Sequence, residues 1–218
     1  MKKAPSKNKL CWDHEYNARR KKFNAIAGLD EAGRGCLAGP VVAATVIFHE
    51  HDTWPDALND SKKLTRSNRQ DLFDEIISVD NISYAIASAS VDEVDALNVL
   101  HASFLAMRRA WQKLHTPPDF ALIDGNRLPM REHWPFEAKA IVKGDGISPS
   151  IAAASILAKE SRDRMMEKLD QKYPGYHFAK HKGYGTKEHL AALQKLGPCT
   201  EHRKSFAPVR QTTLPGFS

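Results

Sequence analysis

The chain has 218 residues, enough for one sizeable core or for one core with an appended helical piece. Its 42% content of hydrophobic residues is ordinary for a globular protein, and no apolar run has the length of a membrane span. The basic N-terminus lacks the apolar segment of a secretory signal. A formal net charge of +6 suits a polyanionic partner, and three widely spaced cysteines favour free thiols in a reducing cytoplasm.

The first third of the chain predicts two strands and a helix. Residues 1–22 are polar and basic, which predicts a loosely ordered arm, either a solubilising tail or an arm that contacts phosphate. Strands are predicted at about 23–30 and 41–49, joined by a glycine-rich loop. A polar loop then leads into a helix near 65–78, with Thr65 as its N-cap.

The middle of the chain predicts a third strand and a long helix. Residues 82–91 alternate weakly and are rich in small side chains, as in a closely packed strand. Ser90-x-x-Glu93 forms a capping box, and apolar residues then recur at helical spacing until Pro117-Pro118. One continuous helix is therefore expected between these points.

Two more strands and two helices complete the pattern. A short strand that ends in Asp124 is predicted at 120–124. Residues 136–145 repeat this arrangement, with a strand, a glycine and then Asp145. Ser148 as N-cap and Pro149 at the first helical position start a long helix that ends at about 172. A last amphipathic helix is expected at 186–196.

The alternation of predicted strands and helices is a mixed α/β pattern. Short links between the first three strands favour an antiparallel meander, and strands reached through helices favour parallel additions. One domain is expected over 23–208, with a helical C-terminal region from about 173 and a flexible tail at 209–218.

Four carboxylates fall at the ends of predicted strands: Asp30 and Glu31, Asp124, and Asp145. Adjacent carboxylates at the end of a buried strand resist ionisation unless a cation is present. An all-oxygen set favours Mg²⁺ or Mn²⁺ over zinc. For any single strand-end aspartate, turn capping is an equally good explanation. Asp163 competes for the fourth place, but its helical position favours a structural ion pair.

Gly33-Arg34-Gly35 follows the first acidic pair and places a cation and open backbone N–H groups beside it. Gly33-x-Gly35-x-x-Ala38 also fits the dinucleotide-binding fingerprint. That fingerprint requires a helix directly afterwards, whereas Pro40 and a β-branched run follow here. A nucleotide cofactor is therefore not expected.

Several of these motifs carry a family resemblance. AGLDEAGRGCLAGPVVAA resembles the signature of the ribonuclease HII family. The similarity continues, in the expected order, through NDSKKLT, ALIDGN, VKGD, AAASILAKESRDRMM and GYHFAKHKGYGT. It covers nearly the whole chain from about Ala25 to Pro208, which makes it far more specific than any one motif.

The resemblance implies a ribonuclease H-like fold: a five-stranded mixed sheet with helices on both faces. It implies a monomeric, metal-dependent endonuclease that cleaves RNA in RNA–DNA hybrids and 5′ of single ribonucleotides in duplex DNA. Asp30, Glu31, Asp124 and Asp145 would hold two Mg²⁺ or Mn²⁺ ions for in-line hydrolysis.

By the same resemblance, the Gly33-Arg34-Gly35 backbone would contact the ribose 2′-hydroxyl, and Tyr184 would stack on the next sugar. Lys62 and Asn98 would contact phosphate, although a solvated surface lysine and a helix-start polar residue explain them equally well. Cys36 and Gly185 stand where the family more often has proline, and the second departure leaves the placement of Tyr184 looser.

Two rival functions are a resolvase or integrase of the same fold class and a basic nucleic-acid-binding module. Neither accounts for the ribose-contacting motifs, and a binding module has no need of four acids that repel phosphate. In the tail, Gln211-x-x-Leu214-x-x-Phe217 resembles peptides that dock on sliding DNA clamps. The alternative is a terminus that folds back onto the domain.

Overall fold

The computed structural model describes residues 10–49, 58 and 65–212. In that part of the chain, five strands form one sheet in the order β3-β2-β1-β4-β5. The strands are β1 (Ile26–Ala32), β2 (Val41–Phe48), β3 (Ile82–Ala89), β4 (Phe120–Asp124) and β5 (Glu137–Ile141). The first three are antiparallel neighbours, and β4 and β5 are added in parallel to β1, which confirms the predicted mixed sheet.

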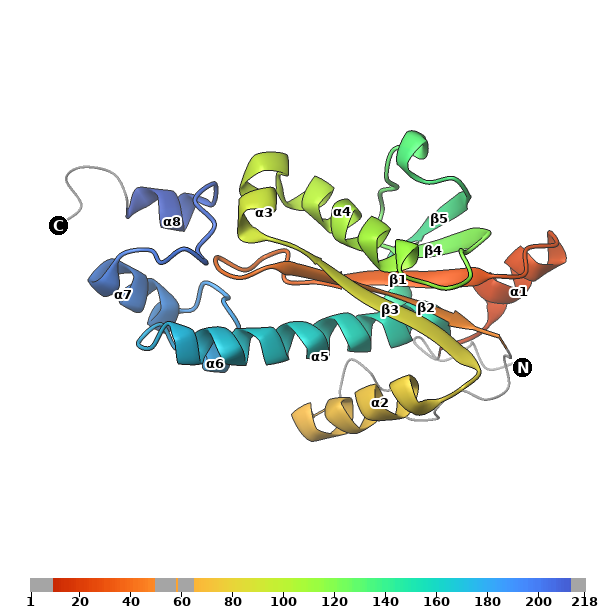
Figure 1. Cartoon of the computed structure of the whole chain (residues 1–218), viewed down its shortest axis with the longest axis horizontal. Coiled ribbons are helices and arrows are strands. Elements are labelled where there is room, and N and C mark those ends of the chain that lie inside the picture. Colours follow the sequence, from red (N-terminus) through yellow and green to blue (C-terminus); the bar gives the residue numbers. More distant parts are fainter. Residues whose placement is uncertain (1–9, 50–57, 59–64, 213–218) are drawn as a thin grey trace, which may run out of the picture.

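Helices cover both faces of this sheet (Figure 1). One face carries α3 (Val91–Leu97) and α4 (Val99–Gln112), and the other carries α5 (Pro149–Lys172) with α2 (Arg66–Ser78) outside it. The predicted N-caps Thr65 and Ser148 accept hydrogen bonds from backbone N–H groups in the first turns of α2 and α5. The Ser90–Glu93 capping box is also present.

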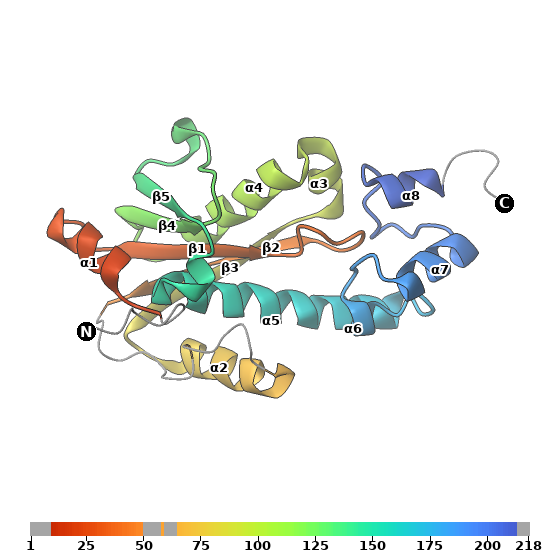
Figure 2. The same ribbon diagram turned by 180° about the vertical axis from the view of Figure 1, so that it is seen from behind.

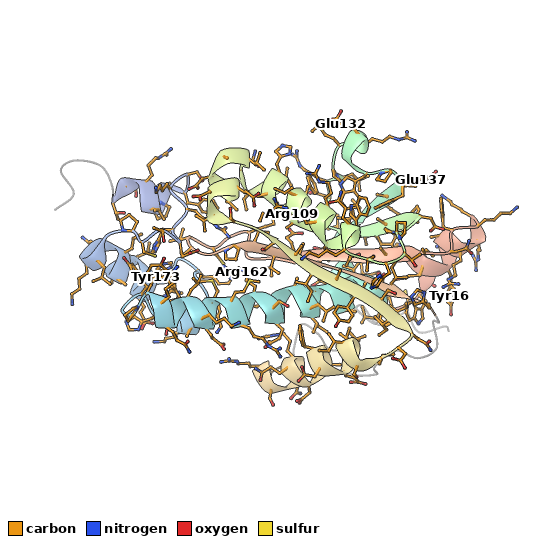
Figure 3. All side chains as sticks on the ribbon, in the orientation of Figure 1. Tyr16, Arg109, Glu132, Glu137, Arg162 and Tyr173 are labelled. Carbon is orange, nitrogen blue, oxygen red and sulfur yellow. The ribbon has the colours of Figure 1, made fainter. Side chains whose placement is uncertain are left out.

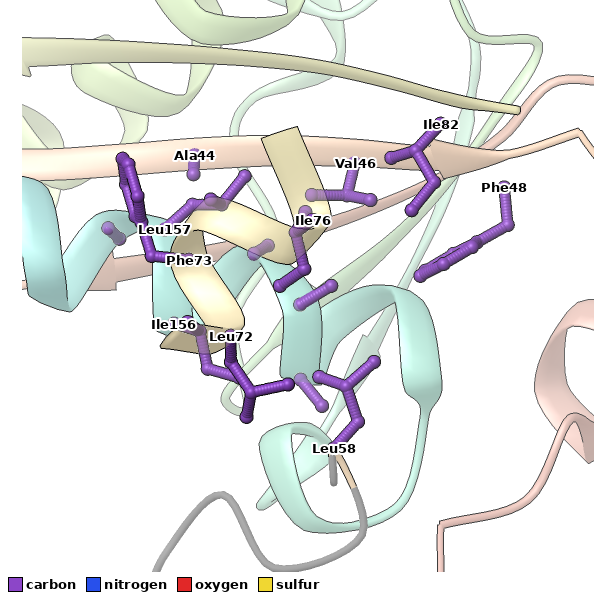
Figure 4. Close-up of a cluster of buried hydrophobic side chains, with 14 of the residues drawn as sticks. Ala44, Val46, Phe48, Leu58, Leu72, Phe73, Ile76, Ile82, Ile156 and Leu157 are labelled. Carbon is purple, nitrogen blue, oxygen red and sulfur yellow. The ribbon is translucent and has the colours of Figure 1, made fainter. Parts of the chain in front are cut away.

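Helix α5 lies directly on β1. A Cβ atom at Gly28 would lie 2.1 Å from the carbonyl carbon of Ser150, so only glycine permits this approach. Farther along, small alanines of α5 and the side chains of Ile156 and Leu157 pack with α2 and with β2 (Figure 4). This cluster fixes the long helix against the sheet and so fixes the strand ends near it.

The helical C-terminal region extends beyond one end of the sheet (Figures 1 and 2). It contains α6 (Phe178–His181), α7 (Lys187–Leu196) and α8 (Ala207–Gln211). The expectation of a solvent-exposed tail from residue 209 is wrong at its start, because Val209 is fully buried against Leu37 and Leu193. Gln211 is exposed at the last position of α8. Leu214 and Phe217 lie outside the described residues.

The expected loose arm at 1–22 is wrong for its second half, where α1 (Asp13–Arg20) forms. Glu15 is 1% exposed, and its Oε1 accepts hydrogen bonds from the hydroxyls of Ser148 and Ser150 at 2.5 and 2.7 Å. A carboxylate at the start of α5 is also favoured by the helix dipole. Helix α1 is thus bound to the N-terminus of α5.

Two other element boundaries differ from prediction. The expected continuous helix after Ser90 is divided at Asn98, whose φ of 64° ends α3 and whose side chain caps α4. The fifth strand ends at Ile141, so Asp145 lies beyond it, in a short 3₁₀ turn, η3 (Gly144–Gly146). Within the described residues, no helix is both long and apolar enough to cross a membrane.

Candidate active site

Parallel pairing brings two of the predicted acids to one end of the sheet. Leu29 of β1 pairs with Ile123 of β4, so Asp30 and Asp124 follow on neighbouring strands with their side chains on the same side. Glu31 comes next on β1 and points to the opposite face, toward α4. The acidic pair lies within the last residues of β1 rather than after the strand, because β1 continues to Ala32.

These acids are held where ionisation is costly. Asp30 is 7% exposed, and its pKa lies well above the ordinary value because of burial first and the charges of Glu31 and Asp124 second. Burial also raises the pKa of Glu31, against the effect of a 2.9 Å ion pair with Arg34. Such mutual repulsion is what a divalent cation would relieve.

Asp124 is the last residue of β4, whereas Asp145 lies in the 3₁₀ turn η3. An oxygen of Asp124 accepts a 2.6 Å hydrogen bond from the amide of Gly144, which ties β4 to the turn that carries Asp145. The charge of Asp124 raises the pKa of both Asp30 and Glu31, so these three acids act on one another electrostatically. Across the described residues, no three acid, histidine or cysteine side chains form a ready-made metal cage.

A small hollow opens beside these acids. Its walls are Glu31 and Arg34, the segment Asp124–Arg127 after β4, and part of α4 with Leu100, Ser103, Phe104 and Met107. Asn98 caps this same helix: its Oδ1 accepts from the amides of Leu100 and His101 at 3.0 and 3.3 Å. The default structural role of Asn98 is therefore present, at an exposed position near the hollow.

The glycine-rich loop after β1 contacts the loop that carries Tyr184. The amide of Leu37 donates to the carbonyl of Gly183 at 2.8 Å, and Cys36 and Tyr184 form an isolated antiparallel bridge. The Tyr184 side chain is 46% exposed beside this contact. The structure thus brings together the two motifs that the resemblance assigns to substrate recognition.

Two buried arginines hold this loop pair in place. Arg162 extends from α5 toward the loop (Figure 3) and donates to the carbonyls of Ala38, Pro40 and Lys182 at 2.9, 3.0 and 2.7 Å. Arg203 donates to the carbonyls of Arg34 and Gly39. Gly33, at φ +97°, is required by Arg162: a Cβ there would lie 2.0 Å from its Nε.

Sequence reasoning missed these arginines. Arg162 lies in a segment that carries the family resemblance, but arginine side chains are usually exposed in proteins. The one sequence signal for its burial is the glycine at position 33, which leaves room for the guanidinium group. Its neighbour Asp163 was interpreted correctly as a structural residue, since it pairs with Arg69 at 2.9 Å and Lys159 at 2.5 Å. Lys62 lies outside the described residues.

Known proteins of similar sequence identify the family. A family model described as Ribonuclease HII matches residues 27–209. The chain is 54% identical to a ribonuclease HII of Burkholderia pseudomallei (strain 668) over 186 residues, which is 85% of each chain. The chain belongs to the ribonuclease HII family. It is accordingly an endonuclease of the ribonuclease H class. The glycines after Asp30-Glu31 are followed by strand β2 and not by the helix that a dinucleotide fingerprint requires.

Solved structures agree with this ribonuclease HII assignment. The PCNA:RNase HII complex from Archaeoglobus fulgidus matches with a TM-score of 0.70 and 26% identity, over 87% of this chain and 97% of that one. A ribonuclease HIII, Bst-RNase HIII in complex with Mn²⁺, matches with a TM-score of 0.66 and 18% identity, over 86% of this chain and 68% of that one. The second likeness shows the shared fold.

The buried acids of this ribonuclease HII predict a stability effect. In EDTA at pH 7, Asp30→Asn is expected to raise the melting temperature, because it removes one of three mutually repelling charges; each kcal/mol is worth roughly 2–4 °C in a chain of this size. Because the folded-state pKa of Asp30 is raised, its ionisation destabilises the folded wild type as the pH rises. The difference in melting temperature between Asp30→Asn and the wild type should therefore vanish toward pH 4.

Scanning calorimetry at both pH values measures this difference. Asp80→Asn is the matched control, because Asp80 is exposed in the turn before β3, at the opposite end of the sheet. A lower melting temperature for Asp30→Asn at pH 7 would show that the carboxylate stabilises the fold.

Proposed function

We propose that this ribonuclease HII cleaves RNA in RNA–DNA hybrids and cuts 5′ of single ribonucleotides embedded in duplex DNA, leaving 3′-hydroxyl and 5′-phosphate ends. One observation carries the proposal: the hollow beside Glu31 and Asp124 is also lined by Arg34, whose loop contacts the Tyr184 loop. Groups suited to hydrolysis and groups suited to ribose recognition therefore lie side by side.

Mg²⁺ or Mn²⁺ is the cofactor that this donor set fits. Asp30, Glu31 and Asp124 offer only carboxylate oxygens, and the pKa values of Asp30 and Glu31 are raised by burial and by neighbouring carboxylates, which a divalent cation would offset. An incomplete protein cage is consistent with Mg²⁺, which keeps waters and takes substrate phosphate as ligands. We assign Asp145 to the same set, at the turn tied to Asp124 through Gly144.

Two cations held by these acids would ionise the attacking water and stabilise the leaving 3′-oxygen. The protein's own contribution is to fix the acids on adjacent strands and to place Arg34 beside them. Arg34 forms an ion pair with Glu31 at 2.9 Å. The Arg34 side chain is half-exposed, and its fork of donors is well matched to a substrate phosphate.

Recognition of a ribonucleotide requires contact with the 2′-hydroxyl, which distinguishes RNA from DNA. Backbone groups of Gly33-Arg34-Gly35 are suited to it, because a Cβ at Gly35 would meet nothing closer than Tyr184 Cε1, at 4.0 Å, so the loop surface is open. The half-exposed Tyr184 ring supplies a face for the neighbouring sugar. Asn98 and Lys62 are proposed to contact phosphate, with the net charge of +6 favouring the duplex.

The remaining assignments concern the setting of the enzyme. The free cysteines Cys11, Cys36 and Cys199 fit a cytoplasmic protein. A sliding clamp is proposed as a partner of the segment with Gln211, Leu214 and Phe217. Its support is the exposure of Gln211 and the PCNA complex of the Archaeoglobus fulgidus relative.

The proposed reaction is tested on a duplex that contains a single ribonucleotide. With Mg²⁺, the protein should cut 5′ of the ribonucleotide, and EDTA should abolish the cut. Asp124→Asn should lower the rate on the order of 10²–10³-fold, because a bound metal supplies several kcal/mol of transition-state stabilisation. Asp80→Asn should act as wild type. Near-normal turnover of Asp124→Asn would remove Asp124 from the site.

Tyr184→Ala tests substrate recognition. It should slow cutting at a single ribonucleotide more than cutting of a continuous hybrid, where many registers are available. Aromatic stacking on nucleic acid is worth about 1–3 kcal/mol, so the ratio of the two kcat/KM values should fall by about tenfold. Tyr184→Phe keeps the ring and should keep the ratio. Equal losses on both substrates would make Tyr184 a scaffold residue.

The clamp contact is tested by binding. The triple variant Gln211→Ala, Leu214→Ala, Phe217→Ala should lose affinity for the purified sliding clamp of the same organism, measured by surface plasmon resonance, while its cleavage of free duplex stays unchanged. Val209 is left intact because it is part of the buried cluster. Equal clamp affinity for the variant and the wild type would show that this segment does not dock.

A further inference from the structure

Three buried histidines lie beneath the Tyr184 loop. His181, His189 and His202 are 8%, 0% and 0% exposed, and they surround Phe178 in the C-terminal region. The rings of His181 and His189 stack with centroids 4.4 Å apart. The Nε2 atoms of His189 and His202 lie 3.0 Å apart, at hydrogen-bond distance. Neither the proposed hydrolysis nor the proposed ribose contact uses these rings directly.

The protonation of His202 follows from its backbone partner. The amide of Cys199 donates to His202 Nδ1 at 3.0 Å, and an amide N–H can only donate. His202 Nδ1 therefore carries a lone pair, which the Cys199 thiol also faces at 3.2 Å. A neutral ring with a bare Nδ1 carries its proton on Nε2. His202 is thus the donor in its contact with His189.

The protonation of His189 follows in turn. Its Nε2 must accept from His202, so its own proton is on Nδ1. His189 Nδ1 lies 2.9 Å from the carbonyl oxygen of Tyr184 and donates to it. The result is a directional series, here called the histidine chain: Cys199 N–H to His202, His202 to His189, and His189 to the Tyr184 carbonyl.

The neighbouring ring obeys the same logic. The amide of Gly183 donates to His181 Nδ1 at 3.2 Å, so His181 carries its proton on Nε2 and donates to the carbonyl of Tyr176 at 2.7 Å. His181 therefore fixes the residue just before Tyr184, while the histidine chain fixes Tyr184 itself. The recognition loop is held from beneath at two consecutive residues.

We infer that His189 and His202 are positioning residues, which hold the Tyr184 backbone through the histidine chain and so set the preference for a single ribonucleotide. The inference rests on the proposed role of Tyr184. Gly185 stands where the family more often has proline, which would stiffen the loop. The hydrogen bonds to Gly183 and Tyr184 supply this restraint instead.

The surroundings keep the three rings neutral. Burial lowers the pKa of all three histidines, that of His202 to about 4. His181 further lowers the pKa of His189, and both of these rings lower that of His202. At His181, the charges of Glu188 and Asp170 raise the pKa, and that of His177 lowers it. Burial also raises the pKa of the Cys199 thiol, which keeps it protonated beside His202. A second proton on His189 or His202 would place two N–H groups face to face.

The tautomers can be observed without any change to the loop. Long-range ¹H–¹⁵N correlation spectra of the full-length protein at pH 7 should show His189 in the Nδ1–H form and His202 in the Nε2–H form. The Nδ1–H form is the minor one for free histidine, so its presence at His189 is diagnostic. Reversed tautomers, or a doubly protonated ring at either position, would overturn the histidine chain.

Two matched substitutions at His189 test its effect on substrate preference. An asparagine amide lies near the position of Nδ1, so His189→Asn retains a donor to the Tyr184 carbonyl. A glutamine amide lies near the position of Nε2, so His189→Gln retains the contact with His202 and loses that donor. Both bury an amide of similar polarity, so their general destabilisation is similar.

The readout is the ratio of kcat/KM on a single ribonucleotide to kcat/KM on a continuous hybrid. His189→Gln should lower this ratio about tenfold, the size of one lost hydrogen bond, whereas His189→Asn should stay within about twofold of wild type. Equal ratios in the two variants would overturn the positioning role. If Tyr184→Ala leaves the ratio unchanged, the proposed role of Tyr184 fails, and the spectra still decide the histidine chain.

Discussion

Two buried guanidinium groups determine the form of the candidate site. A charge taken out of water is costly unless its donors are satisfied, and the donors of Arg162 and Arg203 are directed at backbone carbonyls. Those carbonyls belong to the loop after β1 and to the loop before Tyr184. Lysine could not replace either residue, since one ammonium group lacks the planar fork that reaches several carbonyls at once. The two loops are therefore held in one arrangement, because only that arrangement gives both buried guanidinium groups their hydrogen-bond acceptors.

The acids of the candidate site show the opposite situation. Asp30, Glu31 and Asp124 are brought together by strand register, which stabilises the sheet but not the charges. Protein sites often retain such local strain where function requires it. Under the proposed function, the same repulsion that costs stability would favour binding of a divalent cation. Stability and activity should therefore respond in opposite directions when one of these charges is removed.

Much of the fold was predictable from the sequence because its signals are local. The three antiparallel strands, the caps at Thr65 and Ser148 and the length of α5 depend on residues close together in the chain. What could not be predicted depends on distant partners. Glu15 lies in a basic segment, and Ser148 and Ser150, which are 133 and 135 residues away, make it a buried acceptor. The break at Asn98 required a positive φ that the helical spacing around it conceals.

The same distinction applies to the site. Asp30, Glu31 and Asp124 were predictable because each comes at the end of a recognisable apolar strand. Asp145 was not, because β5 alternates with charged residues and already ends at Ile141, before the turn that carries Asp145. The histidine chain had no sequence signal, since its order depends on which backbone amide faces which ring nitrogen. Arg203 is a further consequence of distance: it donates to Arg34 from 169 positions away. During synthesis, the acids emerge from the ribosome long before this arginine does. A nascent chain therefore carries these acids before it carries the arginine that holds the glycine-rich loop, so the loop can take its folded arrangement only after residue 203 has been translated.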